Sequence, residues 1–380
     1  MFFLTALSLL ALASGYIGMR ILPALPLDGA TRAAGALVLC LPLLLSPATI
    51  FARRLRRRWL ARLLAWAGSL ALGWLSFLLL LTVLREIALL LGWLIWPRAA
   101  AVLRTGSAAA VPLLAALAVL LGLFTALRRP RIVEVSVPLP ELPADLAGFT
   151  IVQISDLHVG NTLRRRSVER VVRMANALAP DLVVITGDLV DGSVSDLTLE
   201  VEPLRRLASR HGTWFVTGNH EYYSGANAWI AELRRLGIHV LLNEHAVLRH
   251  GAADFVLAGV TDTQAAAFDS QQRSDPAAAL RGAPAEVRPR IMLAHRPRSA
   301  LLAAPAGFDL QLSGHTHGGQ FWPWNFVVRY REPLAIGLDR WQGLWVYTSR
   351  GTGYWGPPQR LGVPSELTRL RLTRADEPAA

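Results

Sequence analysis

This chain of 380 residues contains one cysteine and no lysine, and each scarcity has a consequence. The single cysteine, Cys40, lies inside an apolar run and has no partner for an internal disulfide. A small secreted fold held together by disulfides is therefore excluded, and a reducing compartment is allowed. No lysine occurs, so all 39 basic residues are arginines, whose charge is fixed at physiological pH.

Charged residues are also scarce, at 17% of the chain, whereas hydrophobic residues make up 53%. This composition is too apolar for an ordinary soluble protein. The excess lies before Arg128, and the remainder has the composition of a globular domain. The net charge of +12 would suit nucleic acid, but the sequence carries no recognised nucleic-acid-binding motif. We therefore expect no nucleic-acid partner and assign the charge to membrane topology and lipid contact.

The N-terminal third contains apolar stretches long enough to cross the bilayer, which takes roughly 20 residues each. Four spans are predicted, at Met1–Met19, Ala33–Ala52, Leu63–Leu84 and Ala108–Leu127. A fifth apolar piece, Ile87–Trp96, is too short to cross, and we expect it to be interfacial or re-entrant.

Arginine bias predicts the orientation of these spans. One cluster follows the second span and another follows the fourth; they comprise Arg53, Arg54, Arg56, Arg57, Arg58 and Arg62, then Arg128, Arg129 and Arg131. Four crossings place both clusters on one side, so we expect a multi-pass protein of the bacterial inner membrane with a cytoplasmic C-terminal domain. Cleavage of the first span as a signal peptide at Ala11–Ala13 would not change that side. A crossing by Ile87–Trp96 would reverse it.

After Arg131 the pattern changes to short β-rich runs that alternate with helical stretches. Buried runs such as Phe149–Ile154 and Leu182–Thr186 predict strands, and Ser167–Leu178 has helical periodicity. This alternation is typical of a layered α/β domain. We expect a transmembrane region over residues 1–131, an α/β domain over residues 132–374 and a flexible tail over residues 375–380.

Five motifs with ligand side chains follow one another along the α/β domain, and nearly all come just after a predicted strand. They are Asp156-Leu157-His158, Gly187-Asp188 with Asp191, Gly218-Asn219-His220-Glu221, Ala294-His295 and Gly314-His315-Thr316-His317. In an α/β sheet, ligand-binding residues gather beyond the carboxyl ends of the strands, which agrees with this placement. Each motif alone is commonplace, since a Gly-Asp is usually a turn and a lone histidine is usually structural. All five in order, holding five of the nine histidines, indicate one site.

Carboxylate and imidazole groups together suit Zn²⁺, Mn²⁺ or iron. Seven such groups exceed the needs of one tetrahedral site, and they favour two ions about 3.5–4 Å apart, the arrangement used for displacement at phosphorus.

Taken together, the five motifs resemble those of the calcineurin-like metallophosphoesterase superfamily. The preceding spans, Gly318-Gly319-Gln320 and Ser349-Arg350-Gly351-Thr352-Gly353 make the chain similar to its bacterial membrane-anchored, YkuE-like branch. The resemblance covers about Val133 to Leu372 and implies a four-layer α/β/β/α sandwich.

Carried onto this sequence, the resemblance implies two divalent or trivalent metal ions. Asp156, His158 and His317 would hold the first, Asn219, His295 and His315 would hold the second, and Asp188 would bridge them. His220 matches the family histidine that contacts the phosphate and protonates the leaving oxygen. Asp191 matches a residue that orients this histidine in some members. The implied reaction is phosphoester hydrolysis by attack of a metal-bridging hydroxide.

Two departures from related families bear on the substrate. Gly192 and Ser193 stand where protein serine/threonine phosphatases carry a phosphate-gripping arginine, which argues against phosphoprotein substrates. His220 stands where soluble UDP-2,3-diacylglucosamine hydrolases typically carry an arginine. The membrane branch nonetheless includes enzymes proposed to cleave that precursor, so we expect a phosphodiester or pyrophosphate in a lipid or lipid precursor. The alternatives are a soluble phosphoester such as a cyclic nucleotide, or a non-catalytic membrane sensor.

Some residues near the motifs have functional and structural interpretations of similar weight. The aromatic run after His317, namely Phe321, Trp322, Trp324 and Phe326, would either contact an acyl chain or the membrane interface, or pack in the core. Tyr354 and Trp355 would line the same cleft, and Arg350 would clamp phosphate or serve a structural role. A solvated helix start is favoured over phosphate binding for Arg164, Arg165 and Arg166.

Overall fold

The computed structural model describes residues 2–52, 55 and 57–375. Arg53, Arg54 and Arg56 of the predicted basic cluster, and residues 376–380 of the predicted tail, lie outside the described residues. Two compact units are present: residues 1–127 together with 356–361, and residues 128–355 together with 362–380. We describe each unit by itself.

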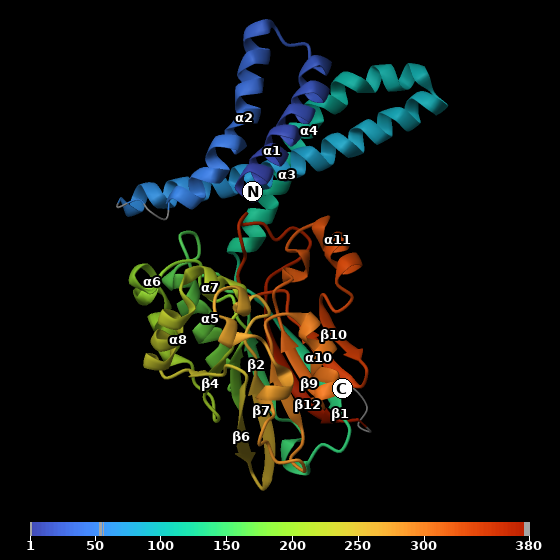
Figure 1. The fold of residues 1–380 in the computed structure, drawn as a ribbon. Coiled ribbons are helices and arrows are strands. Elements are labelled where there is room, and N and C mark those ends of the chain that lie inside the picture. Colours follow the sequence, from blue (N-terminus) through green and yellow to red (C-terminus); the bar gives the residue numbers. More distant parts are fainter. Residues whose placement is uncertain (1, 53–54, 56, 376–380) are drawn as a thin grey trace. The chain divides into compact units, whose positions relative to one another are not determined.

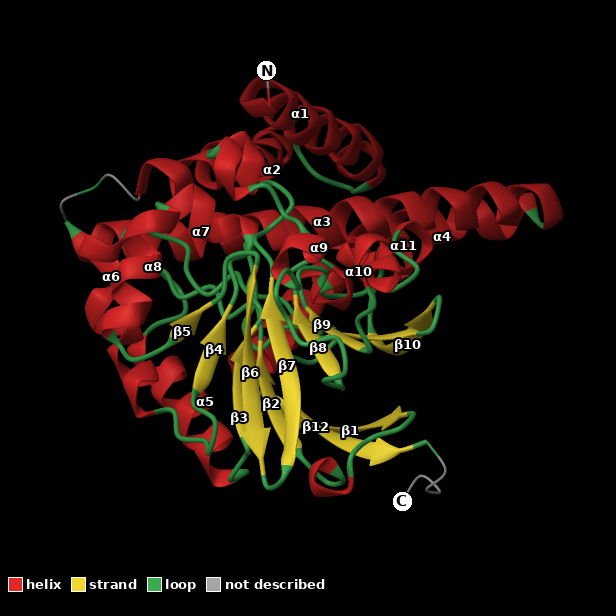
Figure 2. Ribbon diagram, turned by 60° about the horizontal axis from the view of Figure 1, so that its bottom comes forward, coloured by secondary structure: helices red, strands yellow, loops and turns green. Residues whose placement is uncertain are grey.

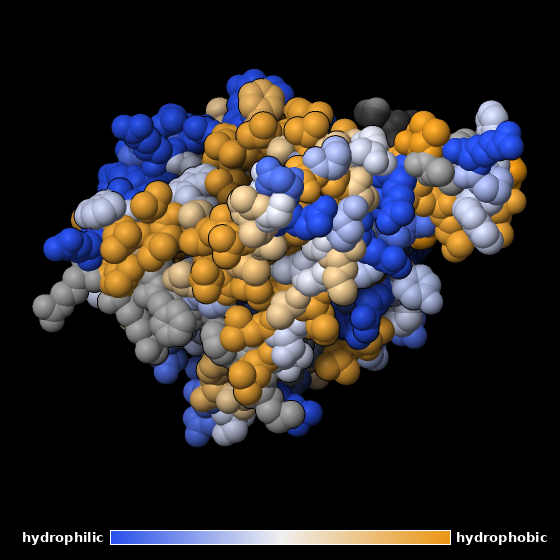
Figure 3. All heavy atoms as spheres, turned by 90° about the horizontal axis from the view of Figure 1, so that it is seen from above, coloured by the Kyte–Doolittle hydropathy of each residue, from blue (hydrophilic) through white to orange (hydrophobic). Residues whose placement is uncertain are grey.

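The first unit is built from four long helices (Figure 1): α1 (Phe2–Ile21), α2 (Gly29–Ala52), α3 (Arg58–Ile95) and α4 (Pro97–Leu127). Each contains a stretch long and apolar enough to span a membrane, at the places where the sequence predicts the four spans. Helices α2 and α4 pack along α3, and the backbones come so close that a Cβ at Gly68 would lie 2.2 Å from the Leu45 carbonyl oxygen. Orange apolar side chains cover much of the face seen in Figure 3.

The apolar piece Ile87–Trp96 is not a separate element, and its interfacial or re-entrant position stays a prediction. These residues continue α3, which runs without interruption to Ile95. Arg85 and Glu86 stand between the predicted third span and Ile87, but they do not break the helix. Arg85 is buried and donates to Ser107 Oγ and to the Arg104 carbonyl of α4. The helix ends only at Trp96, where the following Pro97 disfavours further helical backbone.

Segment 356–361 joins this helical unit although it lies more than 200 residues after α4 in sequence. The Arg360 amide donates to the Gly122 carbonyl of α4 at 3.1 Å, and the Arg360 side chain is fully buried. The side chain of Gln359 fits against two glycines: a Cβ at Gly122 would lie 2.0 Å from its Oε1, and one at Gly73 would lie 3.3 Å from its Cγ. Small residues on α3 and α4 thus make room for this segment.

The second unit is an α/β domain with two six-stranded sheets, ordered β1-β12-β2-β3-β4-β5 and β10-β11-β9-β8-β7-β6. The first contains β1 (Arg131–Leu139), β12 (Glu366–Arg374), β2 (Thr150–Ile154), β3 (Leu182–Ile185), β4 (Thr213–Phe215) and β5 (His239–Val240). The second contains β10 (Gly337–Trp341), β11 (Leu344–Thr348), β9 (Leu310–Ser313), β8 (Arg290–Leu293), β7 (Ala253–Gly259) and β6 (Glu244–His250).

Helices cover the outer faces of both sheets, as Figures 1 and 2 show. Those nearer the first sheet are α5 (Arg165–Ala177), α6 (Val194–Val201), α7 (Asn219–Ser224) and α8 (Ala226–Arg235). Those nearer the second are α9 (Pro276–Ala279), α10 (Ala300–Ala306) and α11 (Trp324–Arg331). The α/β fold class expected from the sequence is confirmed.

The two sheets share one apolar core. Val184 and Trp214 of the first sheet pack in the same cluster as Phe255, Ile291 and Leu312 of the second. The central strands β2, β3, β8 and β9 are buried over almost their whole length, which explains their largely apolar sequences. Strands β2, β3 and β4 are mutually parallel, as are β8 and β9, so the carboxyl ends within each set point the same way.

Candidate metal centre

The predicted ligand residues follow the carboxyl ends of five strands and converge in space. Asp156 and His158 follow β2, Asp188 and Asp191 follow β3, and Asn219 and His220 follow β4. His295 follows β8, and His315 and His317 follow β9. Three groups of side chains lie close enough to hold a metal ion, and the first two share His158: Asp156, His158 and His317; His158, Asp191 and His220; and Asp188, His295 and His315.

The backbone at these positions is unusual. Ten non-glycine residues have positive φ in the described part of the chain, and five of them are predicted ligands: Asp156, His158, Asp188, His315 and His317, with φ between 50° and 69°. Side chains other than glycine seldom adopt this left-handed region, and each such residue costs on the order of 1–3 kcal/mol. Strain concentrated at one set of carboxylates and imidazoles is typical of a functional site.

The first group places donor atoms around one point. His158 Nε2 lies 3.1 Å from His317 Nε2, and His317 Nε2 lies 3.5 Å from Asp156 Oδ1. The Asp156 carboxylate is held in turn by the Ser155 hydroxyl at 2.5 Å and the His315 amide at 2.9 Å. Two imidazole nitrogens and a carboxylate oxygen that face one another in a buried site suit a transition-metal cation such as Zn²⁺ or Mn²⁺.

The group of Asp188, His295 and His315 is arranged in a similar way. His295 Nε2 lies 3.1 Å from both His315 Nδ1 and Asp188 Oδ2. His295 Nδ1 donates to the Thr186 carbonyl at 2.8 Å, which leaves Nε2 unprotonated in the neutral ring and free to bind a metal. Asp188 Oδ2 also lies 3.9 Å from His158 Nε2 of the first group. A single carboxylate oxygen therefore faces both groups.

Asp191 links two histidines through one oxygen. Its Oδ1 accepts from His158 Nδ1 at 3.0 Å and from His220 Nδ1 at 2.6 Å. Both rings therefore direct Nε2 toward the carboxylate of Asp188, at 3.9 Å in each case. The sequence predicts the contact with His220 but not the contact with His158, so Asp191 positions one predicted ligand as well as the predicted acid.

Electrostatics favour charged forms of several of these groups. Burial lowers the pKa of His158, but the Asp191 carboxylate outweighs burial and raises the pKa to about 9. Burial likewise opposes the charged form of His295, and the Asp188 carboxylate raises its pKa to about 10. Burial raises the pKa of Asp188, yet His295 holds it well below its usual range. A bound cation would take over the role of these protons.

Metal binding should therefore strengthen as the pH rises. Below pH 9 the rings of His158 and His295 carry a proton that a metal ion must displace, so each site should gain about tenfold in affinity per pH unit between pH 6 and 8. Calorimetric titration of the metal-free protein, in buffers of different ionisation enthalpy, would measure both affinity and proton release. Equal affinities at the two pH values, without proton release, would contradict this prediction.

Glu221 is a functional residue for which the sequence alone assigns no role. It is completely buried, and its carboxylate accepts hydrogen bonds from four backbone amides: Asp188, Leu189, Val190 and Gly218, at 2.7–3.3 Å. It thereby ties the loop that carries Asp188 to the turn that carries Asn219. Its place in the Gly218-Asn219-His220-Glu221 motif is the only sequence signal for this role.

Arg296 is a second such residue. Its Nε donates to the buried Asp262 at 2.9 Å, and its Nη2 donates to Asn219 Oδ1 at 3.2 Å. Burial, His295 and Arg296 together lower the pKa of His315 to about 2, which keeps that ring neutral as a metal ligand requires. Arg296 is therefore the positive group beside the second set of ligands.

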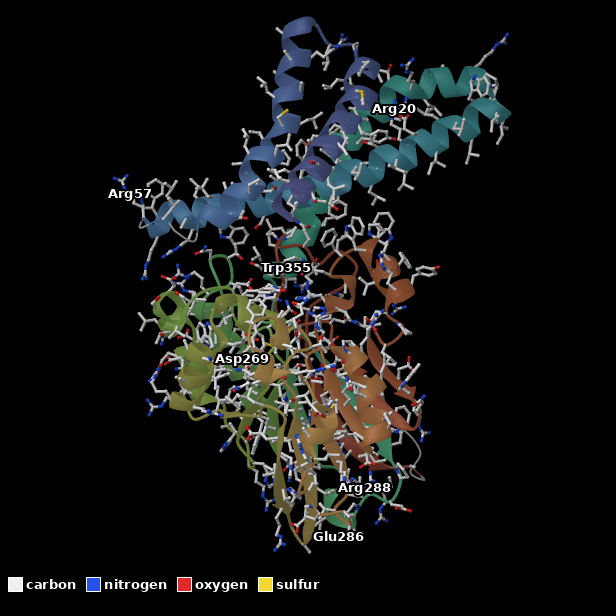
Figure 4. All side chains as sticks on the ribbon, viewed as in Figure 1. Arg20, Arg57, Asp269, Glu286, Arg288 and Trp355 are labelled. Atoms are coloured by element: carbon white, nitrogen blue, oxygen red, sulfur yellow. The ribbon has the colours of Figure 1, made fainter. Side chains whose placement is uncertain are left out.

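Of the remaining sequence candidates, the arginines form structural contacts and one aromatic residue borders the site. The Arg164 side chain and the Arg165 backbone amide both donate to Glu200 at the start of α5, and the Arg165 side chain donates to Glu169, which supports the structural interpretation. Arg350 pairs with Glu366, its Nε lying 3.6 Å from the carboxylate. Tyr354 is buried, whereas Trp355, labelled in Figure 4, is half exposed and its ring centre lies 5.7 Å from that of His220. Trp355 is thus the aromatic residue of this set that borders the site.

Comparison with known proteins identifies similar chains. The calcineurin-like phosphoesterase family matches residues 149–319. A transmembrane protein with metallophosphoesterase domain from Danio rerio is 40% identical over 262 residues, 67% of this chain and 60% of that protein. Its counterpart from Bos taurus is 38% identical over 316 residues, 79% of this chain and 71% of that protein. Metallophosphoesterase YkuE from Bacillus subtilis is 28% identical over 240 residues, 61% and 81% of the two chains.

Proposed function

This chain belongs to the calcineurin-like metallophosphoesterase family, and we propose that it is a membrane-anchored phosphoesterase with a dinuclear metal centre. We propose that it hydrolyses a phosphodiester or pyrophosphate bond in a lipid or lipid precursor such as UDP-2,3-diacylglucosamine. The observation that carries the proposal is the position of Asp188 Oδ2, which faces histidines of two separate ligand groups.

The ligand assignment follows the geometry of the groups. Asp156, His158 and His317 would hold one ion, Asn219, His295 and His315 would hold the other, and Asp188 would bind both. When bound, two such cations lower the pKa of a water between them and neutralise charge on the phosphoryl oxygens. Glu221 keeps Asp188 and Asn219 at a fixed separation by holding the backbone of both loops.

His220 is proposed as the general acid. Its Nδ1 is bound to Asp191, so its Nε2 is the atom that reaches into the site and can give a proton to the leaving oxygen. Asp191 acts as a positioning residue by fixing this ring orientation. Arg296, held by Asp262, would supply an additional positive charge to a substrate phosphate near Asn219.

The lipid nature of the substrate is supported by the attachment of the domain. Only residues 128–130 separate the end of α4, a candidate membrane span, from the start of β1, which would confine the α/β domain near the bilayer. We propose a cytoplasmic location for it, because Arg57, Arg58 and Arg62 and the arginines after α4 would then lie on the positive side. Arg57 and Arg20 lie toward different ends of the helical unit (Figure 4).

The proposal is tested on the full-length protein purified in detergent. Metal analysis should give two ions per chain, and the protein should cleave a diester or pyrophosphate faster than a monoester of the same chromophore. Turnover of a membrane-presented lipid substrate is then compared with turnover of a soluble analogue. Equal turnover of both would favour a soluble substrate such as a cyclic nucleotide, and hydrolysis of none would favour a non-catalytic sensor.

A further inference from the structure

Helix α11, labelled in Figures 1 and 2, packs on the turn His317–Gly319 and presents large apolar side chains to solvent. None of its eight residues is buried. Phe326 is 61% exposed and Tyr330 is 92% exposed, and Trp322, Trp324 and Val327 are exposed as well. Soluble surfaces usually carry such residues singly, so a group of five marks an interaction surface.

The exposed side chains form one side of the helix. Phe326 and Tyr330 are four residues apart and so lie one above the other, with Val327 adjacent and Trp324 one turn before Val327. Two arginines, Arg329 and Arg331, lie in the last turn, and the helix contains no acidic residue. The helix therefore presents aromatic rings to solvent next to fixed positive charges.

This surface has a fixed position in the domain. Arg298 Nε donates to Glu332 at 2.7 Å, and Arg298 Nη2 donates to the Arg331 carbonyl at 2.9 Å, which anchors the end of the helix. At the other end, α11 packs on the turn His317–Gly319, where a Cβ at Gly319 would lie 2.4 Å from Asn325 Cα. The aromatic rings are therefore held near the turn that contains the predicted ligand His317.

We propose that α11 lies in the headgroup region of the bilayer and contacts anionic lipid. Tryptophan and tyrosine favour the membrane–water interface, and arginines beside them attract anionic headgroups. The same chain supplies four spans, and the connection of residues 128–130 keeps the domain close to the bilayer.

This membrane contact does not depend on the proposed reaction, although it would serve it. A lipid-linked phosphoester held in the interface would reach the turn of His317 without leaving the membrane, and that consequence rests on the proposed function. The contact itself can be measured with a protein that has lost its metal ions or its activity.

The test uses the full chain in lipid nanodiscs, with Cys40→Ala as background because Cys40 is the only cysteine. An environment-sensitive fluorophore is attached at Phe326→Cys, and a matched control carries it at Val247→Cys on β6, where the side chain is 43% exposed. Spin-labelled lipid should quench the probe at position 326 and leave the probe at 247 bright. Quenching at 326 should increase when anionic lipid is included.

A second variant tests the role of the charges. Arg329→Gln combined with Arg331→Gln should weaken the response to anionic lipid by about fivefold per arginine, with quenching in neutral lipid retained. Circular dichroism melting would verify that both variants fold. If the probe at 326 is no more quenched than the probe at 247, the proposal is wrong. If it is shielded from water but not quenched by lipid, a protein occupies the surface instead, and the proposal is equally wrong.

Discussion

Replacing Asp188 by alanine should abolish phosphoester hydrolysis, with a loss of at least about 10³-fold in kcat/KM. Asp188 Oδ2 is the atom that faces both ligand groups, 3.1 Å from His295 Nε2 and 3.9 Å from His158 Nε2. Without this carboxylate, the two histidine groups lose their shared anion, and two cations held close together would repel each other. Metal content should fall below two ions per chain in parallel with activity.

Asp339→Ala is a matched control, because Asp339 is an exposed aspartate on β10. This variant should keep both metal ions and full activity. Metal content and turnover of the two variants are measured on the same preparations, and melting curves show whether each variant is folded. Full activity and two bound ions in Asp188→Ala would show that the metal centre is built differently from our assignment.

Replacing His220 by glutamine should lower kcat by about 10²–10⁴-fold while leaving metal content unchanged. The reason is that His220 directs Nε2 into the site and is oriented by Asp191 at 2.6 Å, but is not required as a metal ligand in our assignment. The loss should shrink for substrates whose leaving group is a stable anion, since such a group needs no proton. The measurement is kcat against a series of leaving groups of increasing basicity.

His239→Gln is the control for this series, because His239 is exposed on β5 and stacks on Trp214. Asp191→Asn should combine a reduced kcat with weaker metal binding, because Asp191 also holds His158 at 3.0 Å. A uniform loss in His220→Gln across all leaving groups, or loss of metal ions from it, would assign His220 to metal binding rather than to proton transfer.

The convergence of the candidate ligands could be predicted because it depends on local sequence. A carboxylate or histidine directly after a buried apolar run, as at Asp156, Asp188 and His315, indicates the carboxyl end of a strand, and parallel strands bring such ends together. The four spans could be predicted for a similar reason, since length and apolarity are properties of contiguous residues.

Contacts between distant residues could not be predicted in this way. The pairing of Asp191 with His158 joins residues 33 apart, and Asp262 reaches Arg296 across 34 residues. The carboxylate of Glu221 accepts hydrogen bonds from backbone amides. Such contacts do not depend on the side chains of the donor residues, so the sequence pattern does not reveal them. Strands β6 and β10 contain no buried residue, so their alternation is weak. Helix α11 resembles a core segment by composition although it is exposed.

The continuity of α3 shows how the same pattern can mislead. Arg85 and Glu86 interrupt the apolar sequence, and charged residues are expected to end a span. Here the buried Arg85 is neutralised locally by Glu86 and hydrogen-bonded to α4, so the backbone passes through as helix. The cost of a charge depends on its partners, and these lie on another element.

Segment 356–361 limits how this protein can be divided for experiment. A shortened chain that starts at Arg128 would still contain these residues, yet it would lack Gly122, whose carbonyl binds the Arg360 amide, and Gly73, against which Gln359 packs. The buried Arg360 side chain would then have to be hydrated, and the loop that ends at Trp355, next to His220, would lose its anchor. Work on residues 128–380 alone would therefore describe a perturbed domain, and detergent or nanodisc samples of the whole chain are the appropriate material.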